Sequence, residues 1–376
     1  MKLLLGKTDF SGDVAVNVSG KRPDITANLS SSMINLVDFA GDDKEKTKEN
    51  KNRIFSPEPL SLSGLQAVNA KVTINAKQVK TSSLVLGKTK IVASLKDSNF
   101  LIKPLSTLIA GGSLNGNINL TASGKIAALT TDISLKGLEP SQIGDLKGKI
   151  SGAKTDVTIK VKGKGNGNSV SQIMAGLNGN VLIKSGGGAV KGFGIGIANT
   201  SLLTMLNPMA ESSAETKLEC LVMNFDIKNG IATTNKGIAA VTREMSVIGS
   251  GTIDLKTEKI NINIKPSARE GLGLNAGQLA GMLKLGGTLA EPSPTVDAKS
   301  TLVAAGAAVA TGGLSVLAKG LLDQTTADAD PCASALGQKP ATTSKKEGAP
   351  SAATKIVDTV EETGGSVTDK TKSLFR

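Results

Sequence analysis

The chain has 376 residues, of which 43 are glycine and seven are phenylalanine, and it contains no tryptophan, tyrosine or histidine. Without histidine there is no Ser-His-Asp or Cys-His catalysis and no imidazole ligand for zinc, and with so few rings there are few platforms for stacking sugars or unpaired bases. The formal charge is +12, and residues 323–376 carry seven basic and eight acidic side chains, so the excess lies upstream, where lysines alternate with apolar residues. Such lysines are typical of a solvated sheet face or of contact with anionic lipid headgroups, and we predict no binding of nucleic acid.

Short runs in which apolar and polar residues alternate dominate the chain from its first residues to about residue 300. A period of two is the pattern of a β-strand with one buried face. The clearest runs are 113–121, 155–162 and 259–265, and weaker ones include 13–19, 24–29, 71–77, 132–137, 180–184, 224–228 and 251–256. The apolar positions singled out in these runs are Leu114, Ile118, Leu120, Val157, Ile159, Val161, Ile253, Leu255, Ile260, Ile262 and Ile264.

Helical patterns are few and short. Residues 169–177 carry apolar side chains at spacings of three and four, which predicts a short amphipathic helix, and residues 199–206 and 275–283 are two further candidates. Residues 291–294, with two prolines, predict a rigid linker. Most strand runs are separated by Gly, Asn, Asp or Pro, and Asn229-Gly230 is a hairpin signal.

The predicted organisation has five parts. Residues 1–40 form strands, 41–53 are a charged flexible insertion, 54–300 are the main β domain, 301–322 are an Ala- and Gly-rich apolar helix, and 323–376 are a disordered tail. The helix at 301–322 has three interpretations, which are packing against the sheet, lying at a membrane interface or on a partner, and crossing a bilayer. The fold class is therefore all-β, built from many short antiparallel strands.

Sequence motifs give no catalytic, cofactor or metal site. The Gly-Lys-Thr copies at 6–8 and 87–89 lack the glycine that a phosphate loop requires, and the glycines at 163–167 and 192–196 lack dinucleotide-binding spacing. The acidic residues at 42–49 lack the order of a calcium loop. Cys220 and Cys332 lack metal spacing, and the sequence leaves them either bonded to each other or free. We therefore expect no enzymatic activity.

A continuous apolar face without large aromatic side chains has two interpretations. One is the core of a closed sandwich or β-solenoid, in which sheets pack about 10 Å apart. The other is a trough lined by Val, Ile, Leu and Ala that buries acyl chains, with about 0.8 kcal/mol gained for each buried CH2 group. In the second interpretation the apolar positions named above form the groove wall.

Several sequence segments, in this order along the chain, resemble the C-terminal region of the AsmA family of Gram-negative envelope proteins. This family is related to the TamB-type bridge-like proteins. They lie at residues 6–39, 55–65, 105–125, 135–144, 220–234, 248–266 and 330–337. The resemblance implies an elongated, twisted antiparallel sheet that forms an apolar groove. It also implies a periplasmic protein associated with the inner membrane through an N-terminal anchor, which is absent from this chain.

The function that this resemblance implies is lipid transfer. Phospholipids would be held in the groove for movement between the inner and outer membranes or for outer-membrane homeostasis, with outer-membrane assembly proteins as further partners and no cofactor. The alternatives are a scaffold or assembly factor for outer-membrane proteins that pairs strands at a sheet edge, and a structural β-solenoid, whose fixed repeat the sequence lacks.

Overall fold

A computed structural model describes the fold of this chain. Contacts divide the chain into two units, residues 1–340 and 341–376, and the described residues all belong to the first. They are 1–39, 53–60, 62, 64–81, 84–123, 126–144, 147, 150–165, 169–191, 215–243, 245–269, 283–296, 328 and 330–338. The predicted helices at 199–206 and 301–322 lie outside these residues, as do residues 41–52 of the insertion predicted at 41–53 and residues 275–282 of the helix predicted at 275–283. The last residues of these two predictions are described: Arg53 is bonded to Glu258, and Leu283 begins a strand.

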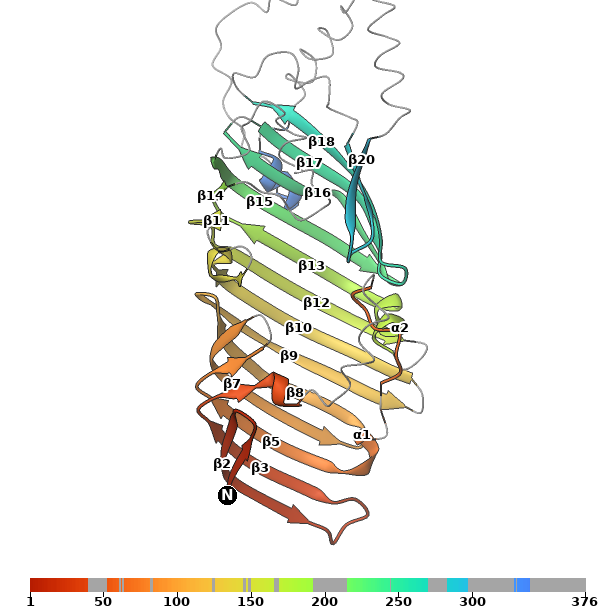
Figure 1. The fold of residues 1–376 in the computed structure, drawn as a ribbon. Helices are drawn as coiled ribbons and strands as arrows, with labels where there is room; N and C mark the ends of the chain where they lie inside the picture. The colour runs from red at the N-terminus through yellow and green to blue at the C-terminus, as the bar shows by residue number, and fades with distance from the viewer. Residues whose placement is uncertain are drawn as a thin grey trace, which may run out of the picture. The chain divides into compact units, whose positions relative to one another are not determined.

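The described residues build one large open sheet of 20 strands (Figure 1). The strands are β1 (Lys2–Leu5), β2 (Thr8–Asn17), β3 (Asp24–Ser31), β4 (Ile34–Asn35), β5 (Asn69–Ala76), β6 (Val79–Lys80), β7 (Val85–Lys96), β8 (Asn99–Ile109), β9 (Gly112–Ser123), β10 (Ile126–Leu138), β11 (Ile150–Ser151), β12 (Thr155–Gly165), β13 (Leu177–Ser185), β14 (Gly188–Lys191), β15 (Glu215–Lys228), β16 (Ile231–Thr242), β17 (Met245–Asp254), β18 (Lys259–Ala268), β19 (Leu283–Gly287) and β20 (Pro292–Val296). The short helical elements are η1 (Leu36–Phe39), α1 (Gly64–Ala67), η3 (Pro140–Gln142), α2 (Val170–Ala175) and α7 (Pro331–Ala335). The predicted all-β fold with a twisted, mainly antiparallel sheet is confirmed.

The strands follow each other through the sheet almost in the order of the sequence. Hydrogen-bonded neighbours run β1-β2-β3-β5-β7-β8-β9-β10-β12-β13-β15-β16-β17-β18-β19-β20. Only the β3–β5 and β4–β6 pairings are parallel. Because β4, β6, β11 and β14 are short pieces beside this series, sixteen of the 20 strands set its length, about 72 Å at roughly 4.8 Å per step.

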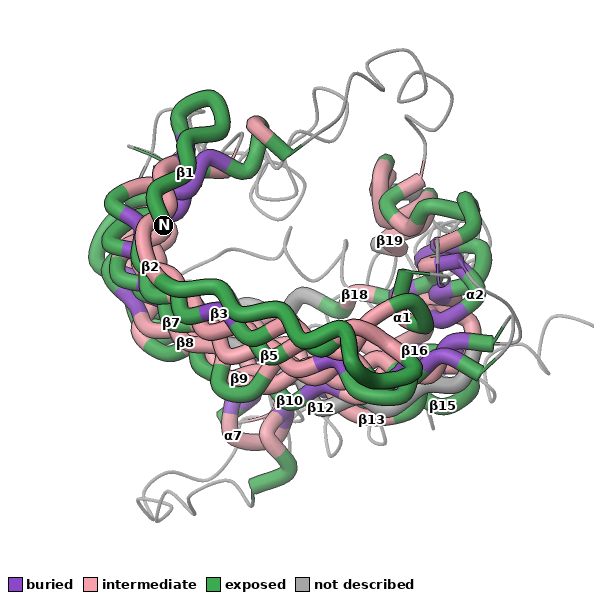
Figure 2. The backbone as a smooth tube through the Cα atoms, turned by 90° about the horizontal axis from the view of Figure 1, so that it is seen from below, coloured by how far each residue is buried: buried purple, intermediate pink, exposed green. Residues whose placement is uncertain are grey.

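The sheet curls around one of its two faces (Figure 2). Glycine permits sharp bends within its strands, and two positions require it. Gly12 in β2 and Gly251 in β17 have φ of 145° and 150°, and a Cβ there would lie 1.9 Å and 2.1 Å from the carbonyl oxygens of Asn28 and Asn261. Any side chain would collide with the neighbouring strand, so these glycines allow close approach where the strands bend.

Two local predictions meet different outcomes. The helix predicted at 169–177 is confirmed as α2, which begins after Ser169, whose hydroxyl accepts a hydrogen bond from the Gln172 N–H at 3.2 Å. The rigid linker predicted at 291–294 is wrong, because Pro292 and Pro294 lie in β20, the last strand of the sheet. Prolines are tolerated on an edge strand, where no further strand needs their missing N–H groups.

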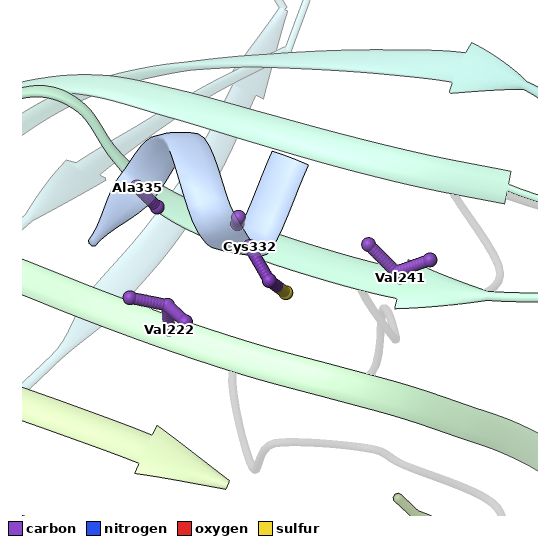
Figure 3. Packing of buried hydrophobic residues seen from close by; sticks show 5 residues of the cluster. Val222, Val241, Cys332 and Ala335 are labelled. Carbon is purple, nitrogen blue, oxygen red and sulfur yellow. The ribbon is translucent and has the colours of Figure 1, made fainter. Parts of the chain in front are cut away.

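The predicted disordered tail at 323–376 also begins too early. Residues 331–335 form α7, which starts after Asp330, whose carboxylate accepts from the Ala333 N–H at 3.0 Å. The helix packs on β15 and β16 with Val222, Ala239, Val241 and Ala335 in one buried cluster (Figure 3). This apolar patch lies on the convex face, where alternation predicts polar residues. The pattern of the strands therefore gave no sign that a helix packs there.

Candidate functional site

The strand register places most of the apolar residues of the alternating runs on the same, concave face. Ile118 of β9 lies opposite Ile102 of β8 and Thr131 of β10, and Ile133 of β10 lies opposite Ile159 of β12. The same alternation continues at the far end, where Ile253 lies opposite Ile260. The opposite, convex face carries mostly Lys, Asn, Asp, Ser and Thr, so the sheet has one apolar and one polar side.

The concave face is open along β2 to β8. Leu29, Ile91 and Ile102 are half-buried there, and Val16 in β2 is 59% exposed. Near one end of these strands the same face is covered, because Ile34, Ala76 and Val79 form a buried cluster. Within the described residues no apolar side chain larger than alanine falls below 2% exposure, and the largest side chains buried to that degree are Glu258 and Thr8. The apolar face is therefore not sealed by a second sheet, which distinguishes it from the core of a closed sandwich.

The concave face is covered along one rim from β9 to β18. We call residues 53–60, 62 and 64–67 the rim segment. Its Leu62 packs with Ile173 of α2 against Ala122 and Ala127, and its Phe55 packs against the cluster around Leu177. A backbone hydrogen bond from Ser171 N–H to the Ser56 carbonyl, at 3.0 Å, joins the rim segment to α2.

A buried carboxylate fastens the rim segment to the turn between β17 and β18. Glu258 is fully buried and accepts hydrogen bonds from the N–H groups of Ile54 at 2.7 Å and Phe55 at 3.0 Å. The Arg53 Nε lies 3.2 Å from the same carboxylate, and its Nη2 donates to the Ser171 hydroxyl and the Lys256 carbonyl. Burial raises the pKa of Glu258, but these donors outweigh it and hold the pKa below its ordinary value.

Two further carboxylates fasten the opposite rim near the start of the chain. Asp9 accepts from the N–H groups of Met33 and Ser32, and these bonds lower its pKa. Partial burial raises the pKa of Asp38, but hydrogen bonds from the Thr8 hydroxyl, the Lys7 N–H and the Asn35 amide lower it further than burial raises it. All these acidic groups hold backbone in place, which is a structural use of their charge.

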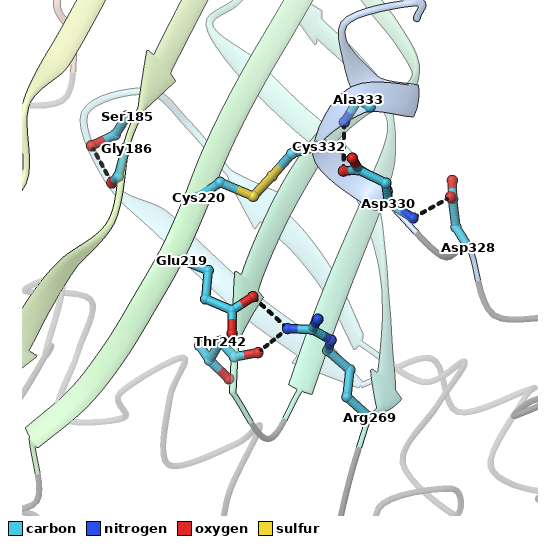
Figure 4. The surroundings of a disulfide bond; sticks show 10 residues. All are labelled: Ser185, Gly186, Glu219, Cys220, Thr242, Arg269, Asp328, Asp330, Cys332 and Ala333. Atoms are coloured by element: carbon cyan, nitrogen blue, oxygen red, sulfur yellow. Dashed lines mark hydrogen bonds and ion pairs between the residues drawn. A yellow bond between two sulfur atoms is a disulfide. The ribbon is translucent and has the colours of Figure 1, made fainter. Parts of the chain in front are cut away.

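A disulfide joins Cys220 of β15 to Cys332 of α7 across 112 residues of sequence (Figure 4). It holds α7 on the convex face, together with a hydrogen bond of 3.3 Å from the Asn224 amide to the Ala335 carbonyl. Nearby, Arg269 Nη1 lies 2.6 Å from the Glu219 carboxylate and donates to the Thr242 carbonyl at 2.7 Å. Leu182 packs against the same α7 cluster.

The structure distributes the residues predicted to line the groove between an open wall and a covered rim. Leu114 and Ile118 are half-buried on the open part of β9, and Ile264 is half-buried on β18. Leu120, Ile253, Leu255, Ile260 and Ile262 are more enclosed, since Leu120 packs beside the rim-segment cluster, Ile253 and Leu255 belong to the Leu177 cluster, and Ile260 and Ile262 are 9% and 4% exposed. Val157, Ile159 and Val161 share the concave face by register in β12, and for these three residues the structure describes the backbone alone.

Sequence reasoning missed concave residues on other strands and the fastenings of the rims. Ile25, Ile74 and Ile133 lie in runs whose weaker alternation already carried the signal. The Arg53–Glu258 pair joins residues 205 positions apart, and no local pattern marks it. Among the described residues there is no cluster of three or more acidic, Cys or His side chains able to hold a metal ion. None of the helices described is long and apolar enough to cross a membrane.

The sequence of this chain is similar to that of known proteins. The chain is 23% identical over 362 residues to the AsmA family protein YhjG of Escherichia coli (strain K12), an alignment that covers 89% of this chain and 51% of that protein. This chain thus spans about half the length of that relative. No solved structure matches the chain significantly. A sequence model of the AsmA family matches residues 2–237, which is more than half of the chain and agrees with the predicted resemblance, so the chain belongs to the AsmA family.

Proposed function

We propose that this protein binds phospholipids by their acyl chains along the concave apolar face and transfers them between membranes of the cell envelope. The observation that carries the proposal is an apolar face of about sixteen strands, on which many aliphatic side chains that the rim segment does not cover are only half-buried. Aliphatic walls suit fluid chains, since each CH2 group removed from water contributes about 0.8 kcal/mol without a fixed geometry. The proposed role is non-enzymatic.

The proposed location is the periplasm, at the inner membrane. Membership of the AsmA family supports association with the envelope. The Cys220–Cys332 disulfide supports the same location, because disulfides persist in the periplasm and are rare in the cytosol. Phospholipids and the two membranes are the proposed partners, and outer-membrane assembly proteins are further candidates.

The test uses two leucines of the same strand that point to opposite faces. Leu105 lies on the concave face opposite Gly116, whereas Leu108 lies on the convex face and is 53% exposed. The protein is exported to the periplasm, purified without detergent and assayed for lipid phosphate per chain and for lipid species by mass spectrometry. We expect bound phospholipid in the wild type and in Leu108→Asp, and a clear loss in Leu105→Asp.

Folding must be measured beside the lipid. Far-UV circular dichroism and urea unfolding of Leu105→Asp separate loss of lipid from loss of structure, and Ile118→Ser provides a milder second change on the same face. Ile262 is unsuitable for this purpose, because at 4% exposure its substitution reports on packing. A well-folded wild type that carries no lipid contradicts the proposal and favours a scaffold for outer-membrane proteins.

A further inference from the structure

The two ends of the strands from β10 to β18 differ in charge. Figure 1 shows α2 at one end of these strands and the short strands β11 and β14 at the other. The rim segment lies at the α2 end, and we call the other end the cationic rim. Each of β10, β12, β13, β15, β16 and β18 carries an exposed basic side chain at or near the cationic rim. These residues are Lys136, Lys154, Lys184, Lys217, Arg243 and Lys265.

Acidic side chains at the cationic rim are fewer. Those that the structure describes there are Glu139, Asp156 and Glu219. Asp156 lies 3.3 Å from the Nζ of Lys184, and Glu219 lies 2.6 Å from the Nη1 of Arg269, a further basic residue of this rim. The cationic rim therefore has an excess of positive charge that its described carboxylates do not neutralise.

At the rim-segment end of the same strands, the described charges balance. The basic residues there are Arg53, Lys228, Lys256 and Lys259, and the acidic residues are Glu58, Asp226, Asp254 and Glu258. Glu258 pairs with Arg53, and the Asp254 carboxylate accepts hydrogen bonds from the N–H groups of Lys256 and Thr257. Of the two ends, the cationic rim is thus the one with an excess of positive charge among the side chains described.

The concave face changes from apolar to polar in the same direction. β13 runs from the rim-segment end to the cationic rim, and its concave residues begin with Leu177, which is 2% exposed, and end with Ser185. Val181 and Ile183 lie between them. The neighbour of Ser185 on β12 is Thr155, and the two hydroxyl oxygens lie 3.2 Å apart. A ligand that lies along these strands therefore meets aliphatic side chains at one end and hydroxyl groups beside basic side chains at the other.

This arrangement fits a ligand with an apolar part and an anionic part. Aliphatic side chains bury hydrocarbon, whereas exposed lysine and arginine side chains attract a phosphate group while their charged ends remain in water. The ammonium group of a zwitterionic headgroup is repelled by the same basic side chains. The cationic rim therefore favours a headgroup with a net negative charge.

We propose that phospholipids lie across the concave face with their acyl chains directed toward the rim segment and their headgroups at the cationic rim, which selects anionic headgroups. The proposal rests on the lipid binding proposed above and adds an orientation and a preferred headgroup. The surface of an anionic membrane has the same chemistry as such a headgroup, so the experiments separate these two sources.

The orientation is measured with single tryptophan reporters in the full chain, which contains no tryptophan or tyrosine of its own. Leu129 and Leu135 share the concave face of β10, about 20 Å apart along the strand. Leu129 packs beside the rim-segment cluster, whereas Leu135 precedes Lys136 at the cationic rim. Each variant is loaded with a probe lipid from vesicles and then separated from them. Bromines at the acyl methyl ends should quench Leu129→Trp more strongly, and a nitroxide acylated onto the amine of phosphatidylethanolamine should quench Leu135→Trp more strongly.

A second pair of reporters guards against a variant that does not fold. Leu120→Trp and Leu114→Trp on β9 lie opposite Leu129 and Leu135 and repeat the comparison on the neighbouring strand. Far-UV circular dichroism selects the folded variants. Equal quenching of the two reporters of a pair by each probe, or the reverse pattern, overturns the proposed orientation.

The headgroup preference is measured on protein exported to the periplasm and purified without detergent. Mass spectrometry should find a higher ratio of phosphatidylglycerol to phosphatidylethanolamine on the wild type than in the membranes of the same cells. In Lys154→Gln/Lys217→Gln/Arg243→Gln this ratio should fall about threefold while the total lipid per chain is retained. Lys228→Gln/Lys256→Gln/Lys259→Gln, at the rim-segment end, removes the same charge and should keep the ratio of the wild type.

The other outcomes distinguish this proposal from lipid binding itself. A folded wild type without lipid overturns both. Bound lipid whose headgroup ratio is the same in all three proteins, or falls equally in both triple variants, overturns the selection of anionic headgroups and leaves lipid binding standing. Flotation with phosphatidylglycerol vesicles tests the membrane as the source. Loss of flotation in the cationic-rim variant, with the bound ratio unchanged, would make this rim a membrane contact instead.

Discussion

The two regions of the sheet use the same strand pattern and bury it to different degrees. Along β2 to β8 many concave side chains are only half-buried and one buried cluster forms around Ile34, Ala76 and Val79, whereas along β9 to β18 the rim segment and α2 enclose the side chains near one rim. Both regions alternate apolar and polar residues with a period of two. Alternation therefore determines which side chains share a face, and segments distant in sequence determine which part of that face remains accessible.

Among the changes that test this difference between the two regions, opening the disulfide is expected to have the largest effect on stability. Opening the Cys220–Cys332 bond frees a loop of 112 residues, and chain entropy then predicts a loss of about 5 kcal/mol of unfolding free energy. The measurement is urea unfolding of the wild type with and without dithiothreitol, beside Cys220→Ser/Cys332→Ser. Amide exchange should increase in α7, β15 and β16 and remain unchanged in β2 to β5. An equal increase in amide exchange in β2 to β5 would contradict a local role for the disulfide.

Glu258→Gln should release the rim segment. The substitution leaves the Arg53 guanidinium without its anionic partner and weakens the bonds from two backbone N–H groups, so we expect about 3 kcal/mol of destabilisation. Limited proteolysis should then cut within residues 53–67. Glu219→Gln is the control, because the Glu219–Arg269 pair is 49% and 37% exposed and should contribute less than about 1 kcal/mol. Similar losses of unfolding free energy in both variants would show that the burial of Glu258 does not strengthen its contribution to stability.

Truncation of matched leucines compares the two regions directly. Leu177 is 2% exposed in the covered region, and Leu177→Ala should cost about 3 kcal/mol, because it leaves a cavity among enclosed neighbours. Leu29 is half-buried on the open face, and Leu29→Ala should cost about 1 kcal/mol. Urea unfolding of the two variants measures both. Equal costs would mean that the open face is packed as tightly as the covered one.

The smallest effect is expected from pH. The pKa values of Asp9, Asp38 and Glu258 lie below their ordinary values of 3.8, 3.8 and 4.5, so the folded state binds these protons less readily than the unfolded chain. Their contribution to stability is complete above the ordinary values and is lost as the pH falls through the lowered ones. Unfolding measured from pH 7 to pH 3 should show a flat upper range and a decline below about 4.5. Asp38→Asn should reduce that decline, and an unchanged profile would argue against its hydrogen bonds.

The sequence predicts the sheet and its two faces well, because alternation is a local property. The residues of β9, β12 and β18 that share the concave face could be assigned from the pattern alone. The covered rim could not, since Arg53 and Glu258 lie 205 positions apart and each reads as an ordinary surface charge. The helix α7 was missed for a related reason, because five residues stabilised by a disulfide and by the patch around Val222 carry no periodic signal.

The connectivity of the sheet has a consequence for the order in which the molecule assembles. Nearly every strand pairs with one that immediately precedes or follows it, so hairpins can add one after another as the chain emerges, with little loop entropy to overcome at each step. Cys332 is synthesised long after β15, and its bond to Cys220 can close only when the intervening strands have been made. Formation of that bond thus shows that the chain has been synthesised past β20 and that α7 has reached β15.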